Sequence, residues 1–138
     1  MIVMRFVDTN ILLYAISTAR DERVKHERAL AILDDNDVAL SVQALQEFYV
    51  QATRSEKSNY VTHEQAVALI ESWLRFRIQE TSVALVQNAL SARSRWNISY
   101  WDAAIVEAAR MAGCNILLSE DFHDGMDFAG VRILNPFR

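Results

Sequence analysis

The sequence predicts an α/β protein in three layers, with a parallel sheet covered by helices on both faces. Two observations lead to this prediction. The segment from Ile2 to Val7 is almost wholly apolar, which is typical of a strand buried on both faces. Short apolar segments then alternate with longer segments of helical periodicity, and this alternation favours parallel strands joined by helical crossovers. Ligands of such sheets bind at the carboxyl ends of the strands, so a functional site is expected there.

The first half of the sequence predicts helices on either side of a second strand. A helix is expected over residues 11–17, and the strongly charged residues 18–28 are expected to form an exposed loop that leads into an amphipathic helix ending near Asp34. The second strand is predicted from Val38 to Leu40. Ser41 is placed to cap the next helix, whose apolar stripe consists of Leu45, Phe48, Tyr49 and Ala52.

Further helices are predicted in the middle of the chain. Polar residues 53–60 are expected to interrupt the helical pattern. Thr62 and Gln65 fit a capping box and are followed by apolar residues at helical spacing. An extended piece is expected from Ile78 to Thr81. Ser82 then opens a helix whose inward face is predicted to consist of Val83, Val86, Ala89 and Leu90.

The last predicted helix begins at Ser99 and carries small side chains that allow close packing. Gly113 is expected to end it, because glycine readily adopts the backbone conformation that terminates helices. A fourth strand from Asn115 to Leu118, a polar loop over residues 120–130 and a short strand from Val131 to Leu134 complete the prediction. The packing face of the helix is expected to consist of Trp101, Ile105, Ala108 and Ala112.

Composition limits the classes of protein that fit. Hydrophobic residues make up 51% and charged residues 23%, with three glycines and one proline, which excludes disordered and low-complexity proteins and fits one globular domain over residues 1–138. The single cysteine, Cys114, excludes an internal disulfide framework and suits the cytoplasm. No apolar run approaches the length of a membrane span. The net charge of −4 argues against a general phosphate-binding surface, although not against a local one.

Four acidic residues are predicted to meet at the carboxyl edge of the sheet. Asp8 ends the first strand, Glu47 lies in the helix after the second, Asp102 lies in the first turn of the small-residue helix, and Asp121 follows the fourth strand. Each has a simpler explanation on its own. Asp8 and Asp102 are placed to cap helices, Glu47 fits an exposed helix position, and Asp121 lies in a polar loop.

Capping does not explain why four separate elements each deliver an acid to the same edge. Carboxylates brought close together repel unless a cation binds or protons are taken up. Mg²⁺ or Mn²⁺ is the expected cofactor, because these ions prefer oxygen ligands and keep waters for a substrate phosphate. The expected chemistry is phosphodiester hydrolysis. Thr9, Asn10 and Ser119 are expected to hold the ligating carboxylates in place.

The sequence resembles PIN-domain ribonucleases of the VapC type, the toxins of toxin-antitoxin pairs. The matching segments span nearly the whole chain in the family's order and read VDTNILLYA, SVQALQEF, ISYWDAAIVEAARMAGC, ILLSEDF and VRILNPF. The resemblance implies a parallel sheet of about five strands, a Mg²⁺ or Mn²⁺ pocket and endonucleolytic cleavage of RNA. It assigns the acids to the same four positions found above. It also implies a homodimer, a cognate antitoxin whose tail covers the pocket, and operator DNA bound only through the antitoxin complex.

Two further acids and two other functions stay open. The fourth motif commonly has one residue between a threonine and the acid, and here it reads Ser119-Glu120-Asp121, so Glu120 is an alternative ligand to Asp121 and Asp124 a further candidate. A catalytically inactive PIN-like scaffold that binds RNA or protein is the alternative function. A phosphoryl-accepting signalling domain would need a lysine near a later strand end, and the sequence has no lysine after position 57.

Overall fold

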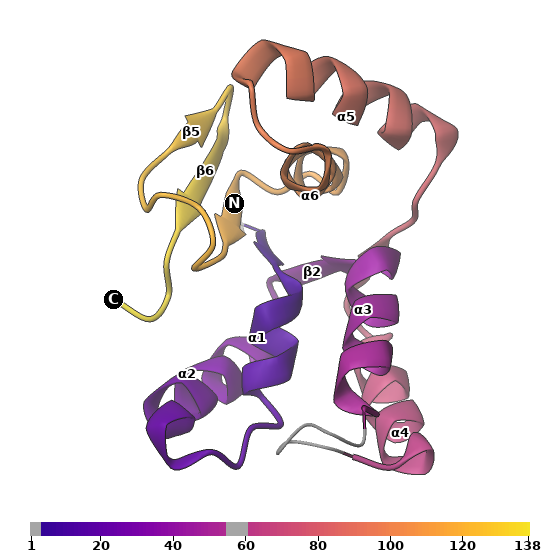
Figure 1. Ribbon diagram of the computed structural model, residues 1–138, viewed down its shortest axis with the longest axis vertical. Coiled ribbons are helices and arrows are strands. Elements are labelled where there is room, and N and C mark those ends of the chain that lie inside the picture. The colour runs from indigo at the N-terminus through magenta and orange to yellow at the C-terminus, as the bar shows by residue number, and fades with distance from the viewer. Residues whose placement is uncertain (1–3, 55–60) are drawn as a thin grey trace.

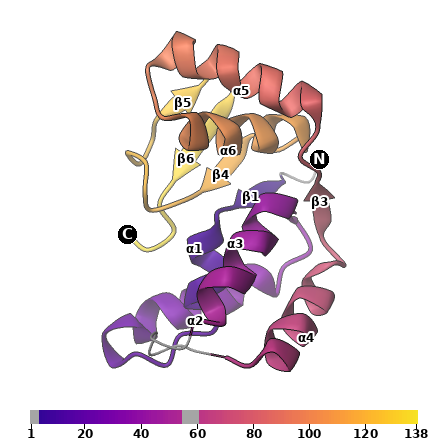
Figure 2. The same cartoon turned by 45° about the vertical axis from the view of Figure 1, so that its right-hand side comes forward.

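The computed structural model describes residues 4–54 and 61–138. The predicted start of the first strand at Ile2 and most of the predicted break at residues 53–60 lie outside the described residues. In the described parts, a sheet lies between two groups of helices, with α5 and α6 on one side and α1 to α4 on the other, as Figure 1 and Figure 2 show. The predicted three-layer α/β architecture is confirmed.

Within the described residues, six strands form one sheet in the order β3-β2-β1-β4-β6-β5. The predicted parallel sheet of about five strands is confirmed, since every neighbouring pair is parallel except β5 and β6. After β1 the chain adds β2 and β3 on one side of it and later adds β4 and β6 on the other, so β1 marks the switch point where such sheets bind ligands. The strands are β1 (Arg5–Val7), β2 (Val38–Ser41), β3 (Arg77–Gln79), β4 (Ile116–Leu118), β5 (Asp127–Phe128) and β6 (Val131–Leu134).

Alternate residues of the central strands enter two separate hydrophobic cores. In β1, Phe6 packs with α5 and α6, whereas Val7 packs with the helices on the opposite face. In β4, Leu117 and Leu118 divide in the same way. This division follows from the geometry of strands, in which successive side chains point to opposite faces. It explains why these strands are apolar at consecutive positions.

Hydroxyl side chains cap four of the helices as the sequence predicts. Ser41, Ser82 and Ser99 each accept a hydrogen bond from a backbone N–H in the first turn, and Thr62 forms the complete capping box with Gln65. The helices are α1 (Thr9–Tyr14), α2 (Arg23–Leu33), α3 (Val42–Ala52), α4 (His63–Trp73), α5 (Val83–Trp96) and α6 (Tyr100–Met111).

The predicted boundaries are wrong at three places. The first helix starts at Thr9 and ends at Tyr14, rather than covering residues 11–17, because Asp8 caps it directly after β1. The charged residues 18–28 are not a continuous loop, since a short 3₁₀ turn at Arg20–Glu22 leads into α2. The predicted polar loop over residues 120–130 also contains β5.

The predicted inward face of α5 is largely wrong. The side chains of Val83 and Leu90 are 75% and 54% exposed, and those that pack inward are Leu85, Ala89 and Ala92. This stripe is buried because α5 packs on α6, whose contact surface is rich in alanines and allows small side chains of α5 to approach closely. Trp101 is also misplaced in the prediction, since it is 65% exposed and the buried surface of α6 begins at Ala103.

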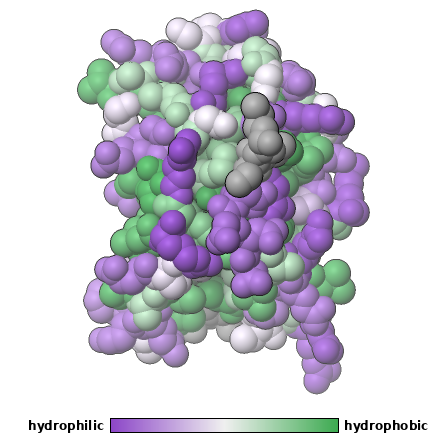
Figure 3. Space-filling model, turned by 180° about the vertical axis from the view of Figure 1, so that it is seen from behind, coloured by the Kyte–Doolittle hydropathy of each residue, from purple (hydrophilic) through white to green (hydrophobic). Residues whose placement is uncertain are grey.

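The surface mixes both kinds of side chain. The face shown in Figure 3 is mostly hydrophilic, with hydrophobic side chains scattered across it. Exposed hydrophobic residues are normal when they occur singly. In the described parts of the chain, no helix has the length and apolar character needed to cross a bilayer.

Candidate metal centre

The carboxyl edge of the sheet brings the four predicted acids into one neighbourhood. Asp8 directly follows β1, and Asp121 lies three residues after the end of β4. Glu47 comes from the middle of α3 and Asp102 from the first turn of α6. The charges of Asp121 and Glu47 both raise the pKa of Asp8, and the charge of Asp102 raises that of Asp121. The acids therefore act on one another electrostatically, as expected for a site at this edge.

Asp8 is both a helix cap and a buried charge. Its Oδ1 accepts a hydrogen bond from the Thr9 N–H at 2.7 Å, and its Oδ2 accepts one from the Ser119 hydroxyl at 2.9 Å. Burial, together with the charges of Asp121 and Glu47, raises the pKa of Asp8 to about 6, although both hydrogen bonds lower it. The carboxylate is thus ionised near neutral pH in surroundings that disfavour its charge.

Each residue predicted to support the acids contacts at least one of them. The Thr9 hydroxyl donates to Glu47 Oε1 at 3.2 Å, and the Asn10 amide donates to Asp121 Oδ2 at 3.0 Å. The Ser119 hydroxyl, which donates to Asp8, also accepts from the Asp121 N–H at 3.1 Å. Ser119 is fully buried. These contacts fix the directions of the carboxylates from the protein side.

Asp102 occupies the capping position that its spacing from Ser99 predicts. Its backbone N–H donates to the Ser99 hydroxyl at 3.1 Å, so the serine caps α6. Burial raises the pKa of Asp121, and the charges of Glu120 and Asp102 raise it further. The charge of Asp102 therefore acts on Asp121 as well. An acid in a first turn is stabilised by the helix dipole. The local role and the shared site are therefore compatible.

The donor set suits a hard divalent ion. The site offers carboxylate, hydroxyl and amide oxygens, the ligand type that Mg²⁺ and Mn²⁺ prefer. Among the residues that the structure describes, no three or more His, Cys, Asp or Glu side chains are grouped closely enough to form a ready-made cage. Mg²⁺ does not require such a cage, because it keeps several waters and is commonly held by one or two carboxylates together with substrate phosphate. The residues present therefore fit such an ion by their chemistry.

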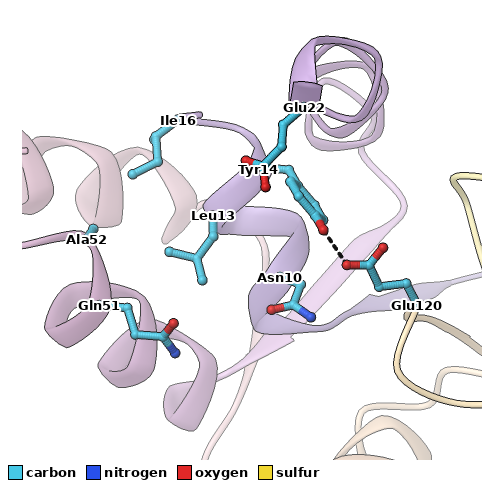
Figure 4. Close-up of a pocket in the computed structure, with 8 residues that line it drawn as sticks. All are labelled: Asn10, Leu13, Tyr14, Ile16, Glu22, Gln51, Ala52 and Glu120. Carbon is cyan, nitrogen blue, oxygen red and sulfur yellow. Dashed lines mark hydrogen bonds between the residues drawn. The ribbon is translucent and has the colours of Figure 1, made fainter. Parts of the chain in front are cut away.

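The two alternative acids have other contacts. Glu120 accepts hydrogen bonds from Tyr14 and Lys25, and Figure 4 shows the Tyr14 side chain and the Glu120 carboxylate pointing toward each other. Asp124 Oδ1 accepts a hydrogen bond from the Asn135 N–H at 2.7 Å and so holds the C-terminal segment. The structure thus directs both carboxylates to contacts other than the four acids.

Tyr14 and Lys25 are not among the residues that the sequence predicts for the site. Tyr14 lies one helical turn after Asn10, so their spacing could have placed both on one face of α1. Lys25 lies in a charged segment and has no local signal, because its partner Glu120 is 95 positions away in sequence.

Hollows in the surface contain Glu120 and Glu47. A cleft of about 200 Å³ is lined by Asn10, Tyr14 and Glu120 together with apolar side chains of α1 and α3, as Figure 4 shows. A more open depression of about 280 Å³ contains Glu47 and Arg54. The second hollow sets a cation beside one of the acids, which suits a phosphate group approaching that edge.

Known proteins of the same fold include toxin-antitoxin proteins. The chain is similar in structure to a toxin-antitoxin complex from Klebsiella pneumoniae (21% identity, TM-score 0.67, 96% of this chain and 97% of that one). It is similar to Mycobacterium tuberculosis VapC20, a sarcin-ricin loop cleaving toxin (21%, 0.65, 85% and 91%). It also resembles FitAB bound to a DNA fragment (22%, 0.72, 98% and 96%). Similarity at these identities shows the fold alone.

The sequence comparisons identify the family. No curated protein sequence matches the chain significantly. The model of the PIN domain family matches residues 5–124, which contain all of the acids discussed above. The chain therefore belongs to the PIN domain family.

Proposed function

We propose that this protein is a Mg²⁺- or Mn²⁺-dependent endoribonuclease and the toxin of a toxin-antitoxin pair. The observation that carries the proposal is the edge of the sheet where Asp8, Glu47, Asp102 and Asp121 act on one another. The names of the similar structures support it, because one is a toxin that cleaves the sarcin-ricin loop and another is a toxin-antitoxin complex. The PIN domain match over residues 5–124 supports the nuclease class.

Some residues of the site would bind the ion, and others would orient the carboxylates that bind it. Asp8, Glu47, Asp102 and Asp121 would hold the ion directly or through water. A bound divalent ion would supply Lewis acidity, which favours a nucleophilic water and neutralises charge that grows on the phosphoryl oxygens. Ser119, Asn10 and Thr9 would orient the carboxylates through the hydrogen bonds described above.

Arg54 would help to place the substrate. It lines the same depression as Glu47, and a guanidinium pairs well with a phosphate. The chain has a net charge of −4, which repels RNA, and a local cation such as Arg54 would attract a phosphate to this edge. Arg54→Ala is therefore expected to raise KM for RNA and to leave Mn²⁺ affinity unchanged.

The proposed partners are those found in the similar structures. One similar structure is a toxin-antitoxin complex, and others contain promoter or other DNA, so we propose a cognate antitoxin for this chain and operator DNA bound only through that complex. A homodimer and a cytoplasmic location complete the proposal.

Cleavage of RNA by the purified protein, free of antitoxin, tests the proposed function. Cleavage is expected with Mg²⁺ or Mn²⁺ and not with EDTA. Asp8→Asn and Asp102→Asn are expected to abolish cleavage while circular dichroism shows an unchanged fold. Undiminished cleavage in EDTA, or by either folded variant, would contradict the metal mechanism. RNA binding without any cleavage would support the inactive scaffold instead.

A further inference from the structure

Lys25, Tyr14 and Glu120 form a hydrogen-bonded group beside the four acids. Lys25 Nζ donates to Glu120 Oε2 at 2.9 Å and to the Tyr14 hydroxyl oxygen at 3.2 Å. The Tyr14 hydroxyl donates in turn to Glu120 Oε1 (Figure 4). Both oxygens of the Glu120 carboxylate therefore have a donor, one from α2 and one from α1.

Aromatic contacts hold this group from another side. The rings of Tyr14 and Phe137 meet edge to face with centroids 5.0 Å apart. Lys25 Nζ lies 5.0 Å from the centroid of the Tyr14 ring and 5.6 Å from that of Phe137, within the range of cation–π attraction. The group thus joins α1, α2, the turn after β4 and the C-terminal segment.

The pairing is partly shielded from water. The side chains of Lys25 and Glu120 are 38% and 20% exposed. Glu120 is therefore a carboxylate that already has a counter-ion, whereas Asp8 accepts hydrogen bonds from the Thr9 N–H and the Ser119 hydroxyl and has no cationic partner among the described contacts.

Asp121, the next residue, is held in a different direction. Its Oδ2 accepts from the Asn10 amide, and its N–H donates to the Ser119 hydroxyl, which also donates to Asp8. Without such partners, two adjacent carboxylates would repel each other. Glu120 pairs with Lys25 and Asp121 accepts from Asn10, so the two adjacent carboxylates have different partners.

We propose that Lys25 and Tyr14 are positioning residues, which draw Glu120 away from the metal pocket and so set the turn that presents Asp121 to the ion. This inference rests on the proposed function, because it assumes a divalent ion at the four acids. It assigns Glu120 the role of an anchor and Asp121 that of the ligand.

Direct titration with MnCl₂ in the absence of RNA, followed by electron paramagnetic resonance, tests the inference. Lys25→Met is expected to weaken Mn²⁺ binding by about tenfold, the lower end of the loss seen when residues that orient a metal ligand are removed. Glu120→Gln should weaken it by a similar factor. The double variant should bind as each single variant does, because both changes break the same contact.

The sign of the Lys25→Met effect separates the inference from its rivals. If Glu120 were a ligand, removing Lys25 would release its carboxylate to bind the ion and would tighten Mn²⁺ binding. If only the net charge near the site mattered, removing the positive charge of Lys25 would also tighten Mn²⁺ binding. Unchanged or tighter binding by Lys25→Met would therefore overturn the inference. Tyr14→Phe, which keeps the ring contact with Phe137 and loses only the hydroxyl, provides a second variant if Lys25→Met does not fold. It should also weaken binding, and Mn²⁺ affinity equal to the wild type would overturn the inference.

Arg23→Met is the matched control. Arg23 lies on the same helix as Lys25 and pairs with Glu27 at 3.5 Å, but both side chains are largely exposed. This variant removes one positive charge from α2 and should bind Mn²⁺ as the wild type does. Absence of Mn²⁺ binding by the wild type would overturn the proposed function itself. Wild-type binding with no weakening in Lys25→Met would overturn the positioning role alone.

Discussion

Asp8→Asn is predicted to stabilise the metal-free protein increasingly as the pH rises. Burial, with the charges of Asp121 and Glu47, raises the pKa of Asp8 from 3.8 to about 6. The folded protein therefore keeps a proton on Asp8 in a range where the unfolded chain has lost it. Wild-type stability falls as the pH rises through this range, because the native state binds more protons than the unfolded state. Asparagine has no charge to desolvate and escapes this loss.

The size of the effect follows from the pKa shift. Each unit corresponds to about 1.4 kcal/mol, so a shift of about 2 units destabilises the wild type by roughly 3 kcal/mol once Asp8 is fully ionised in both states. About half of this loss, roughly 1.4 kcal/mol, falls between about pH 5 and about pH 7.5. The hydrogen bonds from Ser119 and Thr9 favour the ionised carboxylate, so their effect is already contained in this pKa shift.

Urea denaturation in EDTA at both pH values measures the prediction. The free energy of unfolding of Asp8→Asn, minus that of the wild type, should rise by roughly 1.4 kcal/mol from the lower to the higher pH. Asp34→Asn, at an exposed position after α2, is the matched control and should follow the wild type. A difference between Asp8→Asn and the wild type that stays constant with pH would refute the view of Asp8 as a buried carboxylate whose ionisation the fold disfavours.

Three further predictions concern the support of the site and the packing. Ser119→Ala removes the hydroxyl that bridges two of the acids, so calorimetry should show Mn²⁺ binding weakened about tenfold, and an unchanged affinity would speak against that bridge. Ala89→Leu should lower the free energy of unfolding by about 1–3 kcal/mol through overpacking, whereas Leu90→Gln on the exposed face should change it by no more than about 0.5 kcal/mol; the reverse order would contradict the orientation of α5. Arg110→Met should lower the free energy of unfolding, measured by urea denaturation, by about 3 kcal/mol or more, because it leaves the buried Glu107 without its partner. An unchanged free energy of unfolding would contradict the pairing.

Local chemistry explains why most of the fold is predictable from the sequence. Helix starts at Ser41, Thr62, Ser82 and Ser99 depend on a hydroxyl bonding to a backbone N–H within three residues. The parallel sheet follows from apolar strands separated by helices. Both signals lie within short stretches of sequence, so no knowledge of distant contacts is needed.

The orientation of α5 is not predictable in the same way. Its sequence has two apolar stripes, one with Val83 and Leu90 and one with Leu85 and Ala89. Hydrophobicity favours the first stripe, and the structure buries the second because α6 offers a surface of small side chains. The choice between the stripes depends on a partner helix, which a pattern within α5 does not encode.

The acids could be predicted, but their separate roles could not. Asp8 and Asp121 follow strands, and the topology of parallel sheets places such residues at one edge. The different contacts of Glu120 and Asp121 depend on Lys25 and Asn10, which lie about a hundred positions earlier in the chain. Long-range pairs of this kind become visible only when the chain is folded.

A single Mn²⁺ titration that records ion binding and RNA cleavage together tests the central claim most directly. The claim is that the acids at the sheet edge hold the ion that makes this chain a ribonuclease. Binding and cleavage should rise with the same midpoint in the wild type, and both midpoints should move to higher Mn²⁺ concentration in Asp121→Asn. Full cleavage before Mn²⁺ binds, or binding at the acids with no cleavage of any RNA, would contradict the claim.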